Sequence, residues 1–132
     1  MSYEQMYQEQ ILDHYKNPRN FGKLDSFDIH YFDTNPLCGD EIEFFVKLDN
    51  EGKISEIRFN SKGCAISKAA ASLLTLKLKE KRLEEARIMQ NEDVFSMLGI
   101  EISPMRVKCA LLGLKTLQKG IYKYLAKGEK NE

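Results

Sequence analysis

The sequence lacks three features that would each define a class of protein. It has no excess of charge of one sign, because 20 Lys and Arg residues balance 20 Asp and Glu residues, so we do not expect it to bind a nucleic acid backbone. It has no apolar run near the roughly 18 residues that a membrane-spanning helix needs. It begins MSYEQ, without the basic and then apolar regions of a signal peptide. We therefore expect neither a nucleic acid nor a membrane as its partner.

Cysteine is scarce as well. The chain has three cysteines, Cys38, Cys64 and Cys109, and an odd number does not suit a framework of disulfides. We expect reduced thiols and a cytoplasmic location. The length of 132 residues, with 42% hydrophobic and 30% charged residues, predicts one globular domain, residues 1–132, with a single core.

The spacing of apolar residues predicts the elements of the fold. Ser2 and Gln5 form a capping-box pattern ahead of a four-residue repeat, and Pro18 ends that helix. Alternating apolar residues indicate strands, which are followed by helical periods. Strands that precede helices predict an α+β fold, in which a three-stranded antiparallel sheet has helices on one face. The predicted elements are an N-terminal helix over 3–16, strands over 27–32, 42–48 and 54–60, helices over 65–81, 83–89 and 91–98, and a long C-terminal helix from about 104 to 125, followed by a frayed polar tail.

The turn from Asn35 to Asp40 is the first candidate site. Its sequence, NPLCGD, places the Cys38 thiol and the Asp40 carboxylate two residues apart, on a turn that Pro36 and Gly39 favour. Taken alone, the pattern is also that of an ordinary Asx turn with an incidental thiol. It gains meaning only if the other two cysteines come to the same place.

Cys64 and Cys109 each lie at the edge of a predicted element. Cys64 begins a helix, where backbone N–H groups and the positive helix end favour a thiolate. Cys109 lies roughly 140° around its helix from the middle of the apolar stripe, so it is not an obvious core residue of that helix. The alternative for each is a small buried hydrophobic residue, packed in the case of Cys109 against some other element.

Three thiolates and one carboxylate can complete a tetrahedral metal site. The cysteines are separated by 25 and 44 residues, which excludes a Cys-x2-Cys knuckle, so tertiary structure has to assemble the site. His14 and His30 are alternative fourth ligands, and the alternative for both is an ordinary surface or interface histidine.

Several motifs, taken together, resemble those of IscU/SufU/NifU-type iron–sulfur cluster assembly scaffolds. They cover nearly the whole chain and occur in the family's order. The resemblance implies that Cys38, Asp40, Cys64 and Cys109 are the ligands of a transient [2Fe–2S] cluster, and of Zn²⁺ in the cluster-free form. The segments that carry it are DHYKNPRN at 13–20, NPLCGD at 35–40, GCAIS at 63–67, LEEA at 83–86 and RVKCA at 106–110.

The resemblance also implies a function and partners. A scaffold of this type assembles a labile cluster from iron and from sulfur that a cysteine desulfurase delivers, and passes the cluster to acceptor apoproteins; an iron donor or a chaperone is a further partner. The alternative is a zinc-dependent sulfurtransferase that accepts persulfide sulfur from the desulfurase, which would make the chain an enzyme. A third interpretation is a small structural zinc domain that acts only as an interaction module.

The chain combines features of two branches of this family. Lys108 precedes the third cysteine, as in the SufU branch, where many IscU-type scaffolds have a histidine. The interval from Cys64 to Cys109 is too short for the insertion that the SufU branch usually carries. Residues 102–106, ISPMR, match only loosely the LPPVK segment that dedicated chaperones recognise in IscU-type proteins.

Overall fold

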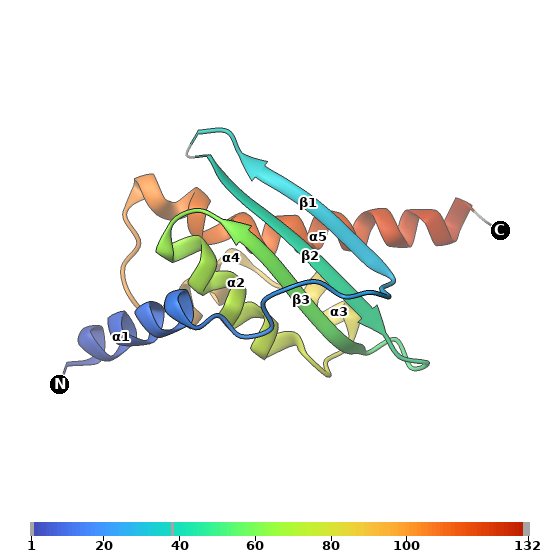
Figure 1. The fold of residues 1–132 in the computed structure, drawn as a ribbon, viewed down its shortest axis with the longest axis horizontal. Helices are drawn as coiled ribbons and strands as arrows, with labels where there is room; N and C mark the ends of the chain where they lie inside the picture. Colours follow the sequence, from blue (N-terminus) through green and yellow to red (C-terminus); the bar gives the residue numbers. More distant parts are fainter. Residues whose placement is uncertain (1, 38, 131–132) are drawn as a thin grey trace.

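Figure 1 shows the computed structural model, which describes residues 2–37 and 39–130, with a sheet lying against helices. The order of strands and helices confirms the α+β fold predicted from the sequence. The elements are α1 (Tyr3–Lys16), β1 (Ile29–Asn35), β2 (Asp40–Leu48), β3 (Ile54–Lys62), α2 (Ala65–Leu78), α3 (Leu83–Arg87), α4 (Asn91–Leu98), the 3-10 turn η1 (Pro104–Arg106) and α5 (Val107–Lys130).

The sheet has the order β1-β2-β3, and both pairs of neighbouring strands are antiparallel. Every second residue of β2 from Ile42 to Val46 is buried, as are Ile57 and Phe59 of β3. These apolar side chains form the inner face of the sheet, as the alternation predicts.

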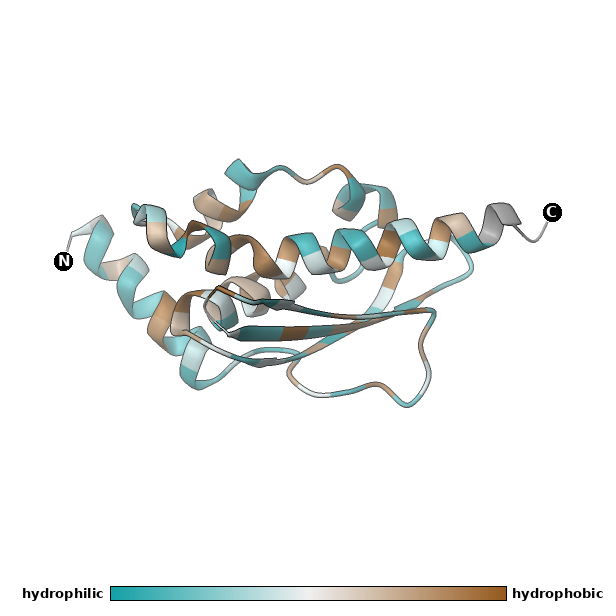
Figure 2. Cartoon of the chain, turned by 90° about the horizontal axis from the view of Figure 1, so that it is seen from above, coloured by the Kyte–Doolittle hydropathy of each residue, from teal (hydrophilic) through white to brown (hydrophobic). Residues whose placement is uncertain are grey.

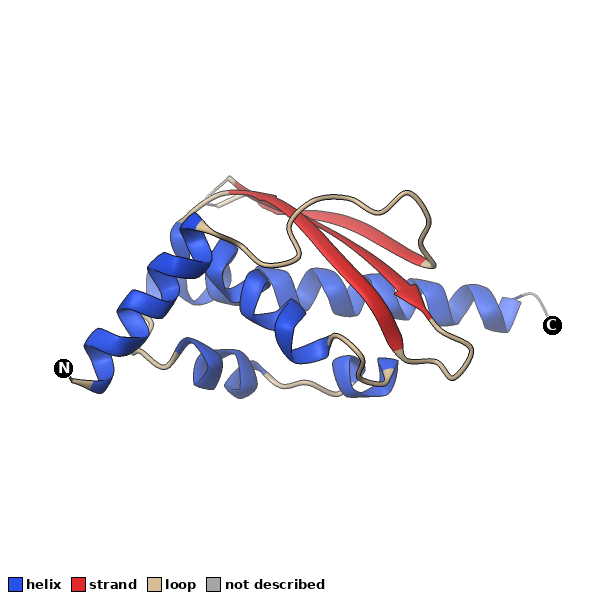
Figure 3. Ribbon diagram, turned by 60° about the horizontal axis from the view of Figure 1, so that its bottom comes forward, coloured by secondary structure: helices blue, strands red, loops and turns tan. Residues whose placement is uncertain are grey.

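All helices lie on the same side of the sheet (Figure 3). α5 packs on β1 and β2, α2 packs on β3, α3 packs on α5, and α4 packs on both α5 and α2. Apolar residues line the space between the sheet and the helices (Figure 2), and the hydrophobic core lies in this space. In the described part of the chain, the long α5 is too polar to cross a membrane, and the other helices are too short or too polar.

The N-terminal helix forms as predicted. Ser2 Oγ accepts the N–H of Gln5, and the Gln5 side chain accepts the N–H of Ser2, which completes the capping box. The helix ends at Lys16, two residues before Pro18. α1 packs mainly on α2.

The first strand differs from the prediction, because it begins at Ile29 and continues to Asn35. The Phe27 ring lies outside the strand, with its centroid 5.3 Å from that of Phe45. The His30 ring stacks on Phe45 as well, at 4.7 Å. These rings lie on the outer face of the sheet, away from the helices, so that face also has an aromatic cluster that the alternation did not reveal.

The predicted ends of several helices were also wrong. α2 ends at Leu78 rather than Lys81, because Glu80 and Lys81 form backbone hydrogen bonds with Ile54 at the start of β3. α3 ends at Arg87. α5 continues to Lys130 where a frayed tail was expected, since its last turns consist largely of good helix formers such as alanine, leucine and lysine.

Candidate metal centre

Three parts of the chain meet at one end of the sheet: the turn between β1 and β2, the junction of β3 with α2, and the start of α5. The turn is closed by Asn35, whose side-chain oxygen accepts the N–H of Leu37 at 3.1 Å and whose carbonyl accepts the N–H of Gly39 at 2.7 Å. Gly39 has φ +75°, a conformation that suits glycine. Asn35 pairs with Asp40 as the last residue pair between β1 and β2. Asp40 therefore lies at the end of the sheet, directly after the turn.

Asp40 is almost fully buried, with 4% of its surface exposed. Its Oδ1 accepts the backbone N–H of Cys64 at 3.2 Å. This places the carboxylate at the positive N-terminal end of α2, where a negative charge is stabilised. The contact requires Gly63, because a Cβ at that position would lie 2.6 Å from Cγ of Asp40. Gly63 is thus a functional position that the sequence analysis did not assign, although it directly precedes a candidate cysteine.

Cys64 is the N-cap residue of α2, where the sequence predicted it. Its side chain is half-buried. Ser67, three residues further along the first turn, is buried, and its Oγ lies 3.8 Å from Cys64 Sγ and donates to the Cys64 carbonyl at 3.1 Å. Ser67 belongs to the motif GCAIS at 63–67, but the motif alone indicates no role for its hydroxyl.

Cys109 is buried, with 3% of its surface exposed, although it lies opposite the apolar stripe of α5. The reason is that this side of α5 is pressed against the sheet and α2. A Cβ added at Gly113 would lie 3.5 Å from Ala71 and from Ile42, and a Cβ added at Gly120 would lie 3.0 Å from Tyr31. Cys109, Gly113, Thr116 and Gly120 form a small-residue face that permits this approach. The sequence periodicity of α5 had indicated only the larger apolar face.

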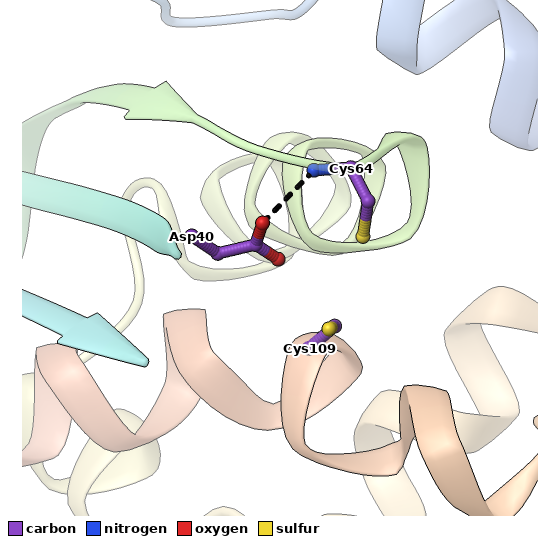
Figure 4. A group of neighbouring side chains, drawn as sticks. All are labelled: Asp40, Cys64 and Cys109. Carbon is purple, nitrogen blue, oxygen red and sulfur yellow. Dashed lines mark hydrogen bonds between the residues drawn. The ribbon is translucent and has the colours of Figure 1, made fainter. Parts of the chain in front are cut away.

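The ligand atoms of Asp40, Cys64 and Cys109 all lie within 4.8 Å of one another. In Figure 4 the sulfur of Cys64 points toward that of Cys109, and the Asp40 carboxylate lies beside both. Ligand atoms in a tetrahedral zinc site are roughly 3.7 Å apart, given zinc–sulfur bonds of about 2.3 Å. Inward shifts of about an ångström would bring these three donors to that spacing, so the donor set and its geometry fit a zinc ion. Cys38, the predicted fourth ligand, lies outside the described residues.

The two histidines considered as alternative ligands lie elsewhere. His14 Nδ1 is 2.6 Å from Ser72 Oγ in the contact between α1 and α2, and His30 Nε2 is 2.6 Å from Glu43 Oε2 on the outer face of the sheet. Neither joins the group of potential ligands formed by the described residues. His14 is buried rather than superficial, and this burial lowers the pKa of its imidazole.

The group opens into a pocket of about 420 Å³. The rim combines cationic and apolar side chains: Arg106 and Lys108 on one side, and the exposed Leu37 and Met105. Lys108 thus lines the pocket of the candidate ligands, next to the cysteine that it precedes in the chain.

Comparison with known proteins finds relatives over nearly the full length of the chain. IscU of Escherichia coli strain K12, named an iron–sulfur cluster assembly scaffold protein, is 35% identical over 126 positions that cover 93% of this chain and 97% of IscU. SufU of Bacillus subtilis strain 168, named a zinc-dependent sulfurtransferase, is 38% identical over 136 positions that cover 89% of this chain and 90% of SufU. Because 89% of this chain is fewer residues than those 136 positions, about 18 positions of the SufU alignment have no counterpart here. For IscU the corresponding number is about 3.

A solved structure shares the whole fold. The crystal structure of FiSufU from Fervidobacterium islandicum AW-1, described as an iron–sulfur cluster assembly scaffold for the SUF system, matches with a TM-score of 0.77 at 26% identity, and covers 91% of this chain and 99% of that one. The family model of the NifU-like N-terminal domain matches residues 6–131. The chain therefore belongs to the family of NifU-like N-terminal domains.

Proposed function

We propose that this chain is a scaffold on which a labile iron–sulfur cluster is assembled and from which it is passed to apoproteins. The observation that carries the proposal is the convergence of Asp40, Cys64 and Cys109, from three separate parts of the chain, within 4.8 Å of one another. The similarity to IscU over nearly the full length supports it. Residues 1–132 would act as one domain, in the cytoplasm.

The proposed thiolate and carboxylate ligands have different roles in binding and releasing the cluster. Cys38, Cys64 and Cys109 are the proposed thiolate ligands, and thiolates bind iron–sulfur clusters firmly. Asp40 supplies a harder oxygen donor, which suits sulfide-bridged iron less well. One corner of the site therefore stays exchangeable, and an acceptor protein can substitute its own thiolate there.

The cargo would be a [2Fe–2S] unit built from iron and from sulfur that a cysteine desulfurase delivers as a persulfide. Lys108 and Arg106 line the pocket and would offset the negative charge of the gathered thiolates. Before cluster assembly, the same four side chains would bind Zn²⁺, which suits thiolate and carboxylate donors. A bound zinc ion would keep these thiolates deprotonated and together.

The second candidate is a zinc-dependent sulfurtransferase, in which one of the same cysteines accepts persulfide sulfur. Two observations favour it: the 38% identity to SufU, and Lys108 in the pocket of the ligand group. The absence of about 18 positions present in the SufU alignment favours the scaffold, since this chain matches the length of IscU more closely.

The test is purification without oxygen, followed by an absorption spectrum with iron, sulfide and zinc quantified on the same sample. A scaffold is expected to be brown, or to take up a cluster on reconstitution, and to transfer it to an apo-ferredoxin. A colourless protein with one zinc per chain, which transfers no cluster after reconstitution but accepts sulfur from a desulfurase, would contradict the scaffold and establish the second candidate.

A further inference from the structure

The hydroxyl of Ser67 is buried beside a candidate ligand. Ser67 lies on the first turn of α2 and is 2% exposed. Its Oγ is 3.1 Å from the carbonyl oxygen of Cys64 and 3.8 Å from Cys64 Sγ. Both neighbours belong to the same residue, so this hydroxyl is committed to Cys64.

A serine hydroxyl has one hydrogen and two lone pairs, and its hydrogen rotates to suit its surroundings. While Cys64 is a thiol, Ser67 can donate to the Cys64 carbonyl and accept the S–H. A sulfur bound to a metal or a cluster has no hydrogen and is only an acceptor. Rotation about the Cβ–Oγ bond of Ser67 then directs the O–H to the sulfur, without movement of the backbone.

The polar groups of Cys64 have different partners. The Cys64 backbone N–H donates to Asp40 Oδ1. Among residues 2–37 and 39–130, Ser67 is the side chain that forms a hydrogen bond with the Cys64 sulfur. Cys64 lines the pocket, whereas Ser67 is buried and is not among the described residues that line it. The hydroxyl therefore contacts the sulfur from the protein side and leaves the sulfur accessible from the pocket.

We propose that Ser67 is a positioning residue of the metal centre: it keeps the Cys64 sulfur in the ligand group and donates a hydrogen bond to that sulfur when it is ligated. The proposal rests on the function proposed above, because it needs Cys64 to be a ligand. Hydrogen bonds to ligating groups orient them and tune their strength as donors, and their loss typically costs 10- to 100-fold in metal affinity.

The test uses metal-free, reduced full-length protein and two probes. Zn²⁺ affinity is measured by competition with a chromophoric chelator, and Co²⁺ is added to record the sulfur-to-cobalt charge-transfer band. The decisive pair is Ser67→Thr and Ser67→Val, which have the same size and differ in the hydroxyl; Ser67→Ala is measured beside them. Ser72→Ala is the matched control, because Ser72 is a buried serine on the same helix that is hydrogen-bonded to His14 and Arg19 instead.

We expect Ser67→Val and Ser67→Ala to bind Zn²⁺ roughly 10-fold more weakly than Ser67→Thr. The charge-transfer band should move to lower energy in both, since a thiolate that loses a hydrogen bond is the stronger electron donor. Ser72→Ala should lower the stability and leave both metal readouts unchanged. Equal affinities and equal bands for Ser67→Thr and Ser67→Val would overturn the proposal, as would the same loss of affinity in Ser72→Ala.

Measurements on the wild-type protein distinguish a failure of this proposal from a failure of the function on which it rests. If the wild type gives no sulfur-to-cobalt band, Cys64 is not a ligand and both proposals fail. If the metal readouts follow expectation but the reconstituted protein transfers no cluster, the scaffold function fails while the role of Ser67 stands.

Discussion

Two clusters of buried polar side chains in the described part of the chain are built differently. At the contact of α1 with α2, His14 Nδ1 lies 2.6 Å from Ser72 Oγ, and the Arg19 N–H donates to the same oxygen at 2.9 Å. At the end of the sheet, the contact of Ser67 with Cys64 Sγ is 3.8 Å, and the three candidate ligand atoms are spread over as much as 4.8 Å. Short, neutral hydrogen bonds complete the first cluster within the protein. In the second cluster the ligand atoms are spaced so that small shifts would allow them to coordinate one metal ion. We therefore expect substitutions in the first cluster to change folding stability and substitutions in the second to change metal binding.

The largest effect should follow removal of a ligand sulfur. Cys109→Ser should weaken Zn²⁺ binding by more than about 100-fold, the upper range for groups outside the ligand set, because a neutral hydroxyl replaces a thiolate. Chelator competition under reducing conditions measures this. Thr116→Ser, on the same face of α5 and fully buried, is the control. An affinity within tenfold of the wild type would exclude Cys109 from the site.

The α1–α2 cluster should control stability rather than metal binding. Ser72→Ala removes the partner of His14 and of the Arg19 N–H, and should lower the free energy of unfolding by about 2 kcal/mol, the range for buried polar groups left without partners. Urea unfolding of the metal-free protein measures it, with Ser55→Ala as the control, since that hydroxyl bonds a backbone carbonyl at a more exposed place. Unchanged stability would contradict the assignment of this cluster as structural.

Asp40 should set the lifetime of a reconstituted cluster. Asp40→Ala removes the oxygen ligand that we propose to be exchangeable, and we expect the cluster to persist several-fold longer, measured by the decay of its visible absorption. Asp40→Asn keeps an oxygen that accepts the Cys64 N–H and separates that structural role from ligation. Asp33→Ala, which removes a carboxylate bound to Lys119, is the control. A cluster of equal or shorter lifetime would show that Asp40 does not confer lability.

The smallest effect concerns pH. Burial, with the nearby Arg19 charge, lowers the pKa of His14 below its ordinary value of 6.5. The unfolded chain therefore binds a proton at His14 at a higher pH than the folded chain does, so stability should fall as pH decreases below about 6.5 and level off below the folded pKa. His14→Gln should flatten the curve of urea midpoint against pH in this window. An unaltered slope in His14→Gln would refute the assignment.

Local sequence signals predicted the elements that depend on local chemistry. The capping box of Ser2 and Gln5 and the Pro18 stop are found in the structure. These features depend on contacts between residues close in the chain. The alternation in β2 and β3 likewise predicted which side chains face the core.

Contacts between residues distant in sequence determine the element boundaries and the burial that the sequence did not predict. The start of β1 depends on its pairing with β2 and on the packing of Phe27 against Phe45, and the end of α2 on its hydrogen bonds with Ile54. Cys109 illustrates the same limit, because periodicity identifies a large apolar face, while a face of small residues becomes buried only when another element approaches it.

The sequence by itself determined the class of fold, the candidate donors and the family resemblance, because residue types and their spacing are local properties. Only the tertiary structure decided that Asp40, Cys64 and Cys109 share one place, that His14 is buried against Ser72, and that Gly63 and Ser67 lie against Asp40 and Cys64 respectively. The physical reason is that the ligand atoms come from chain segments far apart in sequence, and their distances depend on how the sheet packs against α2 and α5.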